Sequence, residues 1–248
     1  MSRAFAAAQS ISIPGDIAGN LIHHQRFMEA AADRNVGLLV FPELSLTGYE
    51  RGLAAELAIL PEDVVLQPLR DLARELGLTA VVGMPIRLAA DAPVLIGALV
   101  LGADGSLGVY SKQHLHAGEE IAFAPGHGGS ILAMGADRVA LAVCADFSQA
   151  SHAAAAAEQG ATLYAAGVLI TEGGYIADTT LLQGYARQHA MMVLMANHGG
   201  ATGGWESAGR SAIWADDGSL IAAAPGVGEL LVMARPQGSG WVGQVVPL

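Results

Sequence analysis

Three polar side chains in this chain follow apolar, strand-like runs and have the chemistry needed to attack a carbonyl carbon together. Glu43 comes directly after Leu-Leu-Val-Phe-Pro, Lys112 follows Leu-Gly-Val-Tyr-Ser, and Cys144 follows Val-Ala-Leu-Ala-Val. A free thiol has a pKa of about 8.5, so a carboxylate that accepts its proton and an ammonium that favours the thiolate would activate it. Strand ends form the ligand-binding crevice of a helix-covered sheet. These residue types therefore indicate covalent catalysis, provided that one crevice receives all three.

Each of the three residues also has an ordinary structural explanation. Cys144 is the only cysteine of the chain, and free cysteine is among the most buried residue types. A glutamate at a strand exit is commonly a solvated carboxylate, and a lysine in a loop is commonly a surface charge. Only a pattern that joins the three distinguishes catalytic groups from a core thiol and two surface charges.

The segments around these residues supply such a pattern, because they resemble the signature of the nitrilase superfamily, the carbon–nitrogen hydrolases. The glutamate segment is Phe-Pro-Glu-Leu-Ser-Leu-Thr-Gly-Tyr at 41–49, and the nucleophile segment is Val-Cys-Ala-Asp at 143–146. The lysine segment is Tyr-Ser-Lys-Gln-His-Leu at 110–115, followed by Gly-Glu-Glu at 118–120 and Pro-Gly at 125–126. Gly160-Ala161, Asn197 and Gly209-Arg210-Ser211 also stand where the family has similar residues. The resemblance covers nearly the whole chain.

The resemblance implies an α/β fold, a four-layer α-β-β-α sandwich with two mixed sheets, and a Glu43–Lys112–Cys144 triad that forms a thioester. It further implies that Glu119 holds Lys112 and that the backbone N–H of Ala145 helps to stabilise the oxyanion. The neighbouring Glu120 is interpreted as a loop charge. The residues expected to contact the substrate are Tyr49, His114, Phe147 and Val168. A homodimer or larger homo-oligomer is expected, also because only 14% of the residues are charged.

The sequence departs from the family directly after the nucleophile. Many relatives carry Arg, then Pro-Glu, then Arg in the following helix, where this chain has Ser148, Ala150-Ser151 and Ala154. The predicted catalytic residues are untouched. The departure therefore concerns the local charge network, the pocket wall and the expected dimer contact near this helix.

Strand-like and helical runs alternate, which predicts sheets covered by helices. The predicted strands outside hairpins are 4–9, 38–41, 79–82, 162–165, 192–196 and 229–234. Turn sequences predict hairpins at 94–101/107–111, 130–134/139–143 and 211–214/219–223. Helices are expected after the capping residue Asp16, over 66–76 before Gly77, over 148–159 and over 179–189. No linker divides the sequence, so we expect a single carbon–nitrogen hydrolase domain over residues 1–248.

Composition argues against several partners and sites. Twelve Lys+Arg against 23 Asp+Glu give a net charge of −11, which opposes binding to nucleic acid or an anionic membrane. Apolar runs such as 163–170 are far shorter than the roughly 18 residues of a membrane span. The first apolar run is too short for a signal peptide, so we expect a cytoplasmic protein with a reduced thiol. His114 and His116 form a His-x-His without an evident third ligand, and neither a metal nor a cofactor is expected.

These observations favour hydrolysis of a small carboxamide to acid plus ammonia. Hydrolysis of a nitrile or an N-carbamoyl group and acyl transfer to an amine are alternatives on the same triad, and a non-catalytic binding protein on this scaffold is another. Relatives that act on nitriles tend to be longer, whereas here about fourteen residues follow the last predicted strand. This difference favours an amide. The negative net charge favours a neutral or cationic amide substrate.

Overall fold

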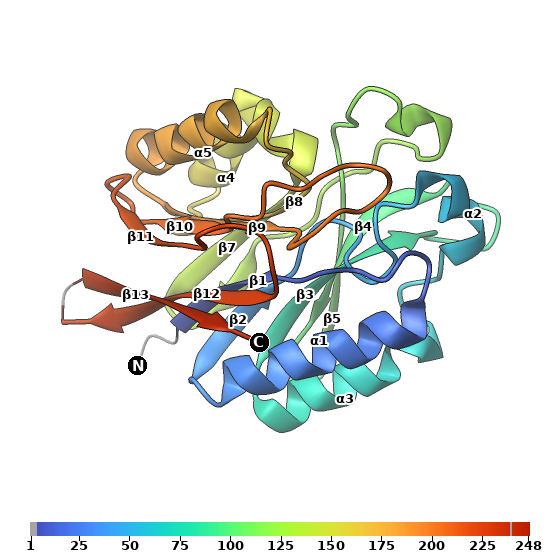
Figure 1. Ribbon diagram of the computed structural model, residues 1–248, viewed down its shortest axis with the longest axis horizontal. Helices are drawn as coiled ribbons and strands as arrows, with labels where there is room; N and C mark the ends of the chain where they lie inside the picture. Colours follow the sequence, from blue (N-terminus) through green and yellow to red (C-terminus); the bar gives the residue numbers. More distant parts are fainter. Residues whose placement is uncertain (1–3, 239) are drawn as a thin grey trace.

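The computed structural model describes residues 4–238 and 240–248, which form two β-sheets packed face to face (Figure 1). One sheet consists of β1 (Ala4–Gln9), β2 (Val36–Val40), β3 (Thr79–Ile86), β4 (Leu95–Leu101), β5 (Leu107–Ser111), β12 (Leu230–Gln237) and β13 (Gly240–Pro247). The other consists of β6 (Leu132–Met134), β7 (Asp137–Val143), β8 (Leu163–Val168), β9 (Met192–Asn197), β10 (Ala212–Trp214) and β11 (Leu220–Ala223). Their strand orders are β13-β12-β1-β2-β3-β4-β5 and β11-β10-β9-β8-β7-β6.

Both sheets are mixed, as the sequence predicts. Strands β1, β2 and β3 run parallel in the first sheet, and β7, β8 and β9 run parallel in the second. The outer strands join them as antiparallel pairs, for example β3 with β4 and β9 with β10. The parallel strands at the centre of each sheet require crossover connections, which bring the helices onto the outer faces.

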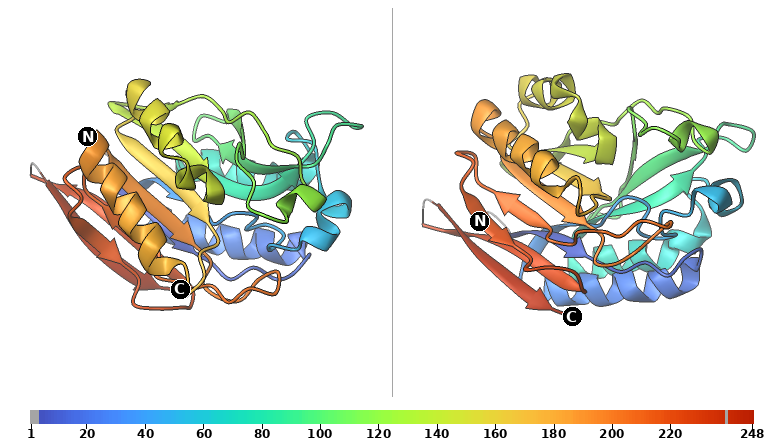
Figure 2. Two further views of the ribbon diagram at one scale, coloured as in Figure 1. Left: turned by 90° about the horizontal axis from the view of Figure 1, so that it is seen from above. Right: turned by 45° about the horizontal axis from the view of Figure 1, so that its top comes forward.

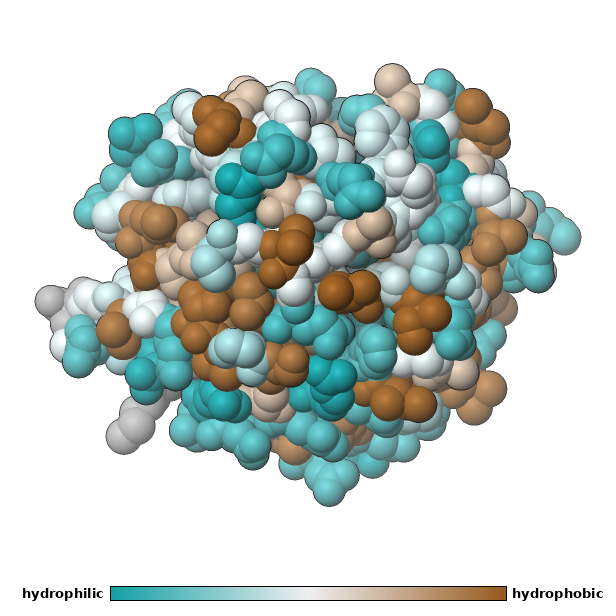
Figure 3. All heavy atoms as spheres, in the orientation of Figure 1, coloured by the Kyte–Doolittle hydropathy of each residue, from teal (hydrophilic) through white to brown (hydrophobic). Residues whose placement is uncertain are grey.

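Two helices cover the outer face of each sheet (Figures 1 and 2). α1 (Ile17–Ala32) and α3 (Gln67–Leu76) lie on the seven-stranded sheet, and α4 (Ala150–Glu158) and α5 (Tyr175–His189) lie on the six-stranded sheet. The short α2 (Ala54–Leu57) lies in the connection between β2 and β3. The region of α1 and α3 presents mostly polar side chains to solvent (Figure 3). Apolar clusters fill the space between the sheets and beneath each helix layer, which confirms the four-layer α-β-β-α sandwich.

The helix ends follow local chemistry. The side chain of Asp16 accepts a hydrogen bond from the backbone N–H of Gly19 at 3.0 Å and so caps α1. Gly77, with φ of 62°, ends α3 in the left-handed conformation that glycine adopts readily. None of the described helices has the length and apolar character needed to cross a membrane.

Some elements differ from the sequence-based expectations. The sequence predicts no strand after 229–234, whereas β13 follows β12 and pairs with it antiparallel along its whole length. Its glycines weaken the strand signal, yet at Gly243 a Cβ atom would come 2.0 Å from the carbonyl oxygen of Ile221, so the packing requires glycine there. The predicted helix 148–159 is shorter, because the 3₁₀ turn η4 (Cys144–Ser148) precedes α4. Helix α5 begins at Tyr175, four residues before the predicted start.

Candidate active site

The predicted triad lies where strands of the two sheets end. Glu43 follows β2 and Lys112 follows β5 in the seven-stranded sheet, whereas Cys144 follows β7 in the six-stranded sheet. The ammonium of Lys112 lies 2.7 Å from Oε1 of Glu43 and 2.7 Å from each carboxylate oxygen of Glu119. The hydroxyl of Tyr49 donates to Oε1 of Glu119 at 2.5 Å. We call Glu43, Lys112, Glu119 and Tyr49 the Lys112 cluster.

The main chain around Glu43 is held between the two sheets by close contacts. At Gly83 on β3, a Cβ atom would come 2.3 Å from the backbone nitrogen of Leu44, and at Gly167 on β8 it would come 2.6 Å from the carbonyl oxygen of Phe41. Nε2–H of the buried His198 donates to the carbonyl oxygen of Glu43 at 2.8 Å. Burial lowers the pKa of His198 to about 4, so this imidazole is neutral. Two glycines and one neutral histidine thus hold the main chain that carries the Glu43 side chain.

Cys144 occupies a tight turn at the end of β7. Its φ is 42°, a left-handed conformation that is uncommon for a residue with a side chain and recurs at functional sites. The turn continues as η4 and places Ala145 in the wall of the pocket that Cys144 lines. Sγ of Cys144 lies 3.7 Å from the carbonyl oxygen of Leu169, which can accept a hydrogen bond from the thiol.

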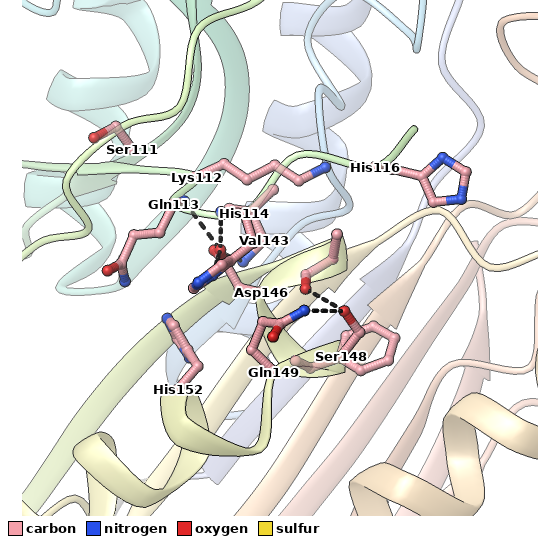
Figure 4. A network of polar contacts seen from close by, with 12 residues as sticks. Ser111, Lys112, Gln113, His114, His116, Val143, Asp146, Ser148, Gln149 and His152 are labelled. Atoms are coloured by element: carbon pink, nitrogen blue, oxygen red, sulfur yellow. Dashed lines mark hydrogen bonds and ion pairs between the residues drawn. The ribbon is translucent and has the colours of Figure 1, made fainter. Parts of the chain in front are cut away.

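A second buried carboxylate ties the Cys144 turn to the strand end that carries Lys112 (Figure 4). Oδ1 of Asp146 accepts hydrogen bonds from the backbone N–H groups of Gln113 and His114, at 2.9 and 2.8 Å. Its Oδ2 accepts from the backbone N–H of Val143 at 3.0 Å and from the hydroxyl of Tyr110 at 2.6 Å. One side chain therefore connects the two sheets beside the nucleophile candidate.

The hydrogen bonds continue from Asp146 into the helix layer. Nε2–H of His152 donates to the oxygen of Tyr110 over 2.9 Å, and the hydroxyl of Tyr164 donates to Nδ1 of His152 over 2.8 Å. Burial lowers the pKa of His152, which keeps it neutral and able to donate and accept at once. We call Asp146, Tyr110, His152 and Tyr164 the Asp146 cluster. Of these four residues, His152 lies within the segment 148–154, where the sequence departs from the signature that it resembles.

Electrostatics differ among the three triad candidates. Burial raises the pKa of Glu43 to about 7, with Glu119 acting in the same direction and Lys112 opposing both. Burial, reinforced by the Glu43 carboxylate, raises the pKa of the Cys144 thiol. Burial works to lower the pKa of Lys112, but Glu43, Cys144 and Glu119 outweigh it and the net shift is upward. At neutral pH the arrangement holds a cationic lysine, a protonated thiol and a glutamate close to its titration point.

A pocket of about 290 Å³ opens above the thiol. Glu43 and Cys144 lie among the residues that line it. Its apolar wall comprises Tyr49, Phe147, Leu169, Ile170 and Trp205. Tyr49 and Phe147, both expected to contact a substrate, are therefore at this pocket. Below, this space is called the Cys144 pocket.

The other two predicted substrate contacts, His114 and Val168, do not line the Cys144 pocket. The imidazole of His114 is 40% exposed, with Nδ1 3.2 Å from Oδ1 of Asp146, and it lines a separate cavity together with His152. Val168 is fully buried against the helix layer, and the next two residues, Leu169 and Ile170, line the pocket instead. Within residues 4–238 and 240–248, no group of three or more His, Cys, Asp or Glu side chains is arranged to hold a metal ion.

Sequence reasoning assigned no role to Asp146 or to Asn197, although both stand in family-like segments. The side-chain amide of Asn197 accepts from the backbone N–H of Ile170 at 2.9 Å and donates to the carbonyl oxygens of Ile170 and Gly209 at 3.0 and 2.9 Å. It thus holds the loop that forms one pocket wall. A buried polar residue at the end of an apolar strand is the signal that could have identified it.

Comparison with known proteins agrees with this architecture. Residues 5–239 match the model of the carbon–nitrogen hydrolase family. A Pseudomonas protegens protein described as a hydrolase in the pqqF 5' region is 30% identical over 231 residues, 89% of this chain and 78% of that protein. A Pyrococcus abyssi nitrilase is 32% identical over 147 residues, 57% of this chain and only 55% of that protein, so the match spans about half of that relative.

Among solved structures, a variant of the amidase of Nesterenkonia AN1, from the nitrilase superfamily, superimposes with a TM-score of 0.85 at 26% identity. The superposition covers 95% of this chain and 92% of that one. Another variant of the same amidase, in complex with butyramide, gives the same TM-score and identity. The resemblance found in the sequence motifs is confirmed: this chain belongs to the carbon–nitrogen hydrolase family of the nitrilase superfamily.

Proposed function

We propose that this protein hydrolyses a small carboxamide to a carboxylic acid and ammonia through a thioester on Cys144. The observation that carries the proposal is the state of Glu43: one oxygen binds the Lys112 ammonium at 2.7 Å, and the other, Oε2, is buried with no hydrogen-bond partner among the described residues. A carboxylate with a free oxygen and a pKa of about 7 is suited to take up and return a proton at neutral pH. Its place in a pocket shared with the only thiol supports a joint role.

In the first half-reaction, Glu43 accepts the thiol proton as Sγ of Cys144 bonds to the amide carbon. Because burial raises the thiol pKa, proton transfer accompanies the attack and a standing thiolate is not needed. Negative charge develops on the amide oxygen, for which Lys112 and the backbone N–H of Ala145 are the candidate donors. Such a donor contributes about 2.7–4 kcal/mol. Glu43 then gives its proton to the nitrogen, the C–N bond breaks and ammonia leaves.

In the second half-reaction, Glu43 takes a proton from water, and the resulting hydroxide attacks the thioester carbonyl. The C–S bond breaks, the acid is released, and Cys144 recovers the proton from Glu43. One carboxylate thus serves both steps, and acid–base help of this kind contributes roughly 10²–10⁴ in rate. Glu119 acts as a positioning residue in this scheme, because its two contacts with Lys112 hold the ammonium in place.

An amide is preferred to a nitrile on two grounds. Glu43 can deliver the proton that a departing amine requires, and the apolar wall of a 290 Å³ pocket suits a short acyl group. The similar Nesterenkonia amidase has a variant solved in complex with butyramide, which supports the same substrate class. The nitrilase of Pyrococcus abyssi is the observation that favours the second candidate, nitrile hydrolysis.

The test offers matched amides and nitriles that carry the same acyl group to the wild-type protein and to Cys144→Ala. We expect ammonia release from the amides, a wild-type mass increased by the acyl group in rapidly quenched samples, and neither signal from Cys144→Ala with unchanged circular dichroism. Turnover by Cys144→Ala above a few per cent of wild type would contradict the thioester. Faster turnover of the nitriles across several pairs would favour the second candidate.

We also propose a homo-oligomer that works in the cytoplasm. The charged fraction of 14% supports the assembly, and the need to keep a single thiol reduced supports the compartment. Light scattering of the purified protein at micromolar concentration tests the first point. A mass near 25.3 kDa would contradict an oligomer.

A further inference from the structure

The Cys144 pocket changes character between its inner and outer parts. Phe147 and Ile170, which are buried, contribute to its apolar wall. Arg51 and Asp178 are partly exposed and His116 is exposed, and all three line the same pocket. An acyl chain that reaches Cys144 along the apolar wall therefore passes ionisable groups from three separate segments.

Asp178 is the ionisable group of this rim with unmet bonding capacity. Its carboxylate makes no hydrogen bond or ion pair with any described residue. The guanidinium of Arg51, by contrast, donates to the carbonyl oxygen of Gly118 at 3.3 Å, and Nδ1 of His116 lies 3.2 Å from the carbonyl oxygen of Ala117. Asp178 is thus a rim acid with no hydrogen bond or ion pair to the described part of the chain.

The surroundings of Asp178 do not neutralise it. The neighbouring acid Glu172 forms an ion pair with Arg210, whose guanidinium also stacks on the ring of Tyr175 at 4.2 Å. Burial raises the pKa of Asp178, and His116 opposes that shift only in part. A partly desolvated carboxylate that lacks a donor is unfavourable in the free protein and gains when a cation binds.

We propose that Asp178 binds a cationic group on the acyl chain, so that the preferred substrates are carboxamides whose acyl chain ends in a protonated amine. This inference rests on the proposed amide hydrolysis and names the substrate class of that site. The ammonium donates to the Asp178 carboxylate while the carboxamide reaches Cys144. The net charge of −11 favours approach of a substrate with the same positive charge.

A purely structural role for Asp178 makes a different prediction. The residue lies in the first turn of α5, where an acidic side chain stabilises a helix through its dipole. That role changes the stability of the protein, but it does not change how the enzyme discriminates between substrates of different charge. The ratio of kcat/KM for an aminated amide to that for the matching neutral amide therefore distinguishes the two roles.

The experiment measures this ratio for ω-amino alkanamides, plain alkanamides and ω-carboxy alkanamides of increasing chain length. We expect the wild type to favour the best amino amide by about two- to fivefold, the range of one partly exposed charge pair. Asp178→Asn should bring the ratio to about one, and Asp178→Lys should shift the preference to the carboxy amide. The matched control Glu172→Gln, which removes a nearby acid outside the pocket, should keep the wild-type ratio.

The outcomes separate this inference from the proposed function. If wild-type protein hydrolyses plain amides but shows no preference for the amino amides, or if Asp178→Asn keeps that preference, the role of Asp178 is wrong and amide hydrolysis stands. If no carboxamide of any charge gives ammonia or an acyl-enzyme mass, the proposed function fails, and this inference fails with it.

Discussion

The Lys112 cluster and the Asp146 cluster are both buried, both polar and both built around a carboxylate, yet their hydrogen bonding differs. Each carboxylate oxygen of Asp146 accepts two hydrogen bonds from neutral donors, which are backbone N–H groups and one hydroxyl. The ring of His114 makes an additional, longer contact. In the Lys112 cluster, one ammonium serves two carboxylates, and Oε2 of Glu43 has no partner within the described part of the chain. Burial raises the pKa of Glu43 to about 7, so this group can titrate at neutral pH, whereas in the Asp146 cluster burial and the Asp146 carboxylate raise the pKa of Tyr110 and keep its hydroxyl protonated.

This difference in hydrogen bonding indicates a structural role for the Asp146 cluster and a reactive role for the Lys112 cluster. A network in which each acceptor is filled is rigid and has one favourable arrangement, which suits the attachment of the Cys144 turn to the strand end at Lys112. A network that leaves a buried acceptor open stores an unfavourable state that a proton relieves. We therefore expect substitutions in the Lys112 cluster to reduce activity more than substitutions in the Asp146 cluster, and the two clusters to differ in how far substitution changes stability.

Glu43→Gln should have the largest effect on activity. The amide cannot accept a proton, so acylation should fall by at least about 10³-fold. Stability should stay equal or rise at neutral pH, because the folded-state pKa of Glu43 is raised and its ionised form therefore opposes folding as pH increases. Quenched-sample mass spectrometry measures acylation, and urea unfolding measures stability. Acylation at the wild-type rate would contradict the assigned role.

Lys112→Met should also abolish turnover, but with the opposite effect on stability. It leaves Glu43 and Glu119 buried together without the ammonium that each contacts at 2.7 Å. Breaking a buried ion pair in this way destabilises by about 3–5 kcal/mol. Urea unfolding of both variants under one condition gives the comparison. A Lys112→Met protein as stable as Glu43→Gln would show that the ammonium does not hold this cluster together.

Asp146→Asn should reduce activity less, by about ten- to hundredfold, and reduce stability by about 1–3 kcal/mol. Whichever way the amide lies, its NH₂ group faces backbone N–H donors that the carboxylate now satisfies. The acyl-enzyme should still form, because no proton carrier is lost. Asp137→Asn, at the start of the strand β7 that leads into the Cys144 turn, is the matched control and should change neither quantity. Full loss of acylation in Asp146→Asn would mean that the Asp146 cluster takes part in the reaction and does not only hold the Cys144 turn.

The smallest expected effect is the pH dependence of the wild type. Glu43 must be ionised to accept the thiol proton, and its pKa is about 7. The value of kcat/KM should therefore fall roughly tenfold for each pH unit below that value, and level off above it. Measuring kcat/KM for one neutral amide as a function of pH tests this fall. If kcat/KM began to fall only near about pH 4.3, the ordinary pKa of glutamate, burial would not raise the pKa of Glu43.

The sequence predicted much of the architecture, for reasons that are visible in particular residues. Apolar runs such as 139–143 and 192–196 form buried strands because they are short, continuously apolar and flanked by turn residues. Strand β13 escaped prediction because glycines interrupt its pattern, and its order comes from pairing with β12. The expected single domain stays a prediction.

Residue type and order were sufficient to nominate Glu43, Lys112 and Cys144, because the proton acceptor, cation and thiol each follow a strand in the family's arrangement. Distances in three dimensions were required for the rest. Gly83 on β3 and Gly167 on β8 are far apart in the chain, yet both make room for the turn that carries Glu43. The pKa of about 7 likewise depends on burial between two sheets. Local chemistry sets what a side chain can do, whereas desolvation and close approach arise only when distant segments pack together.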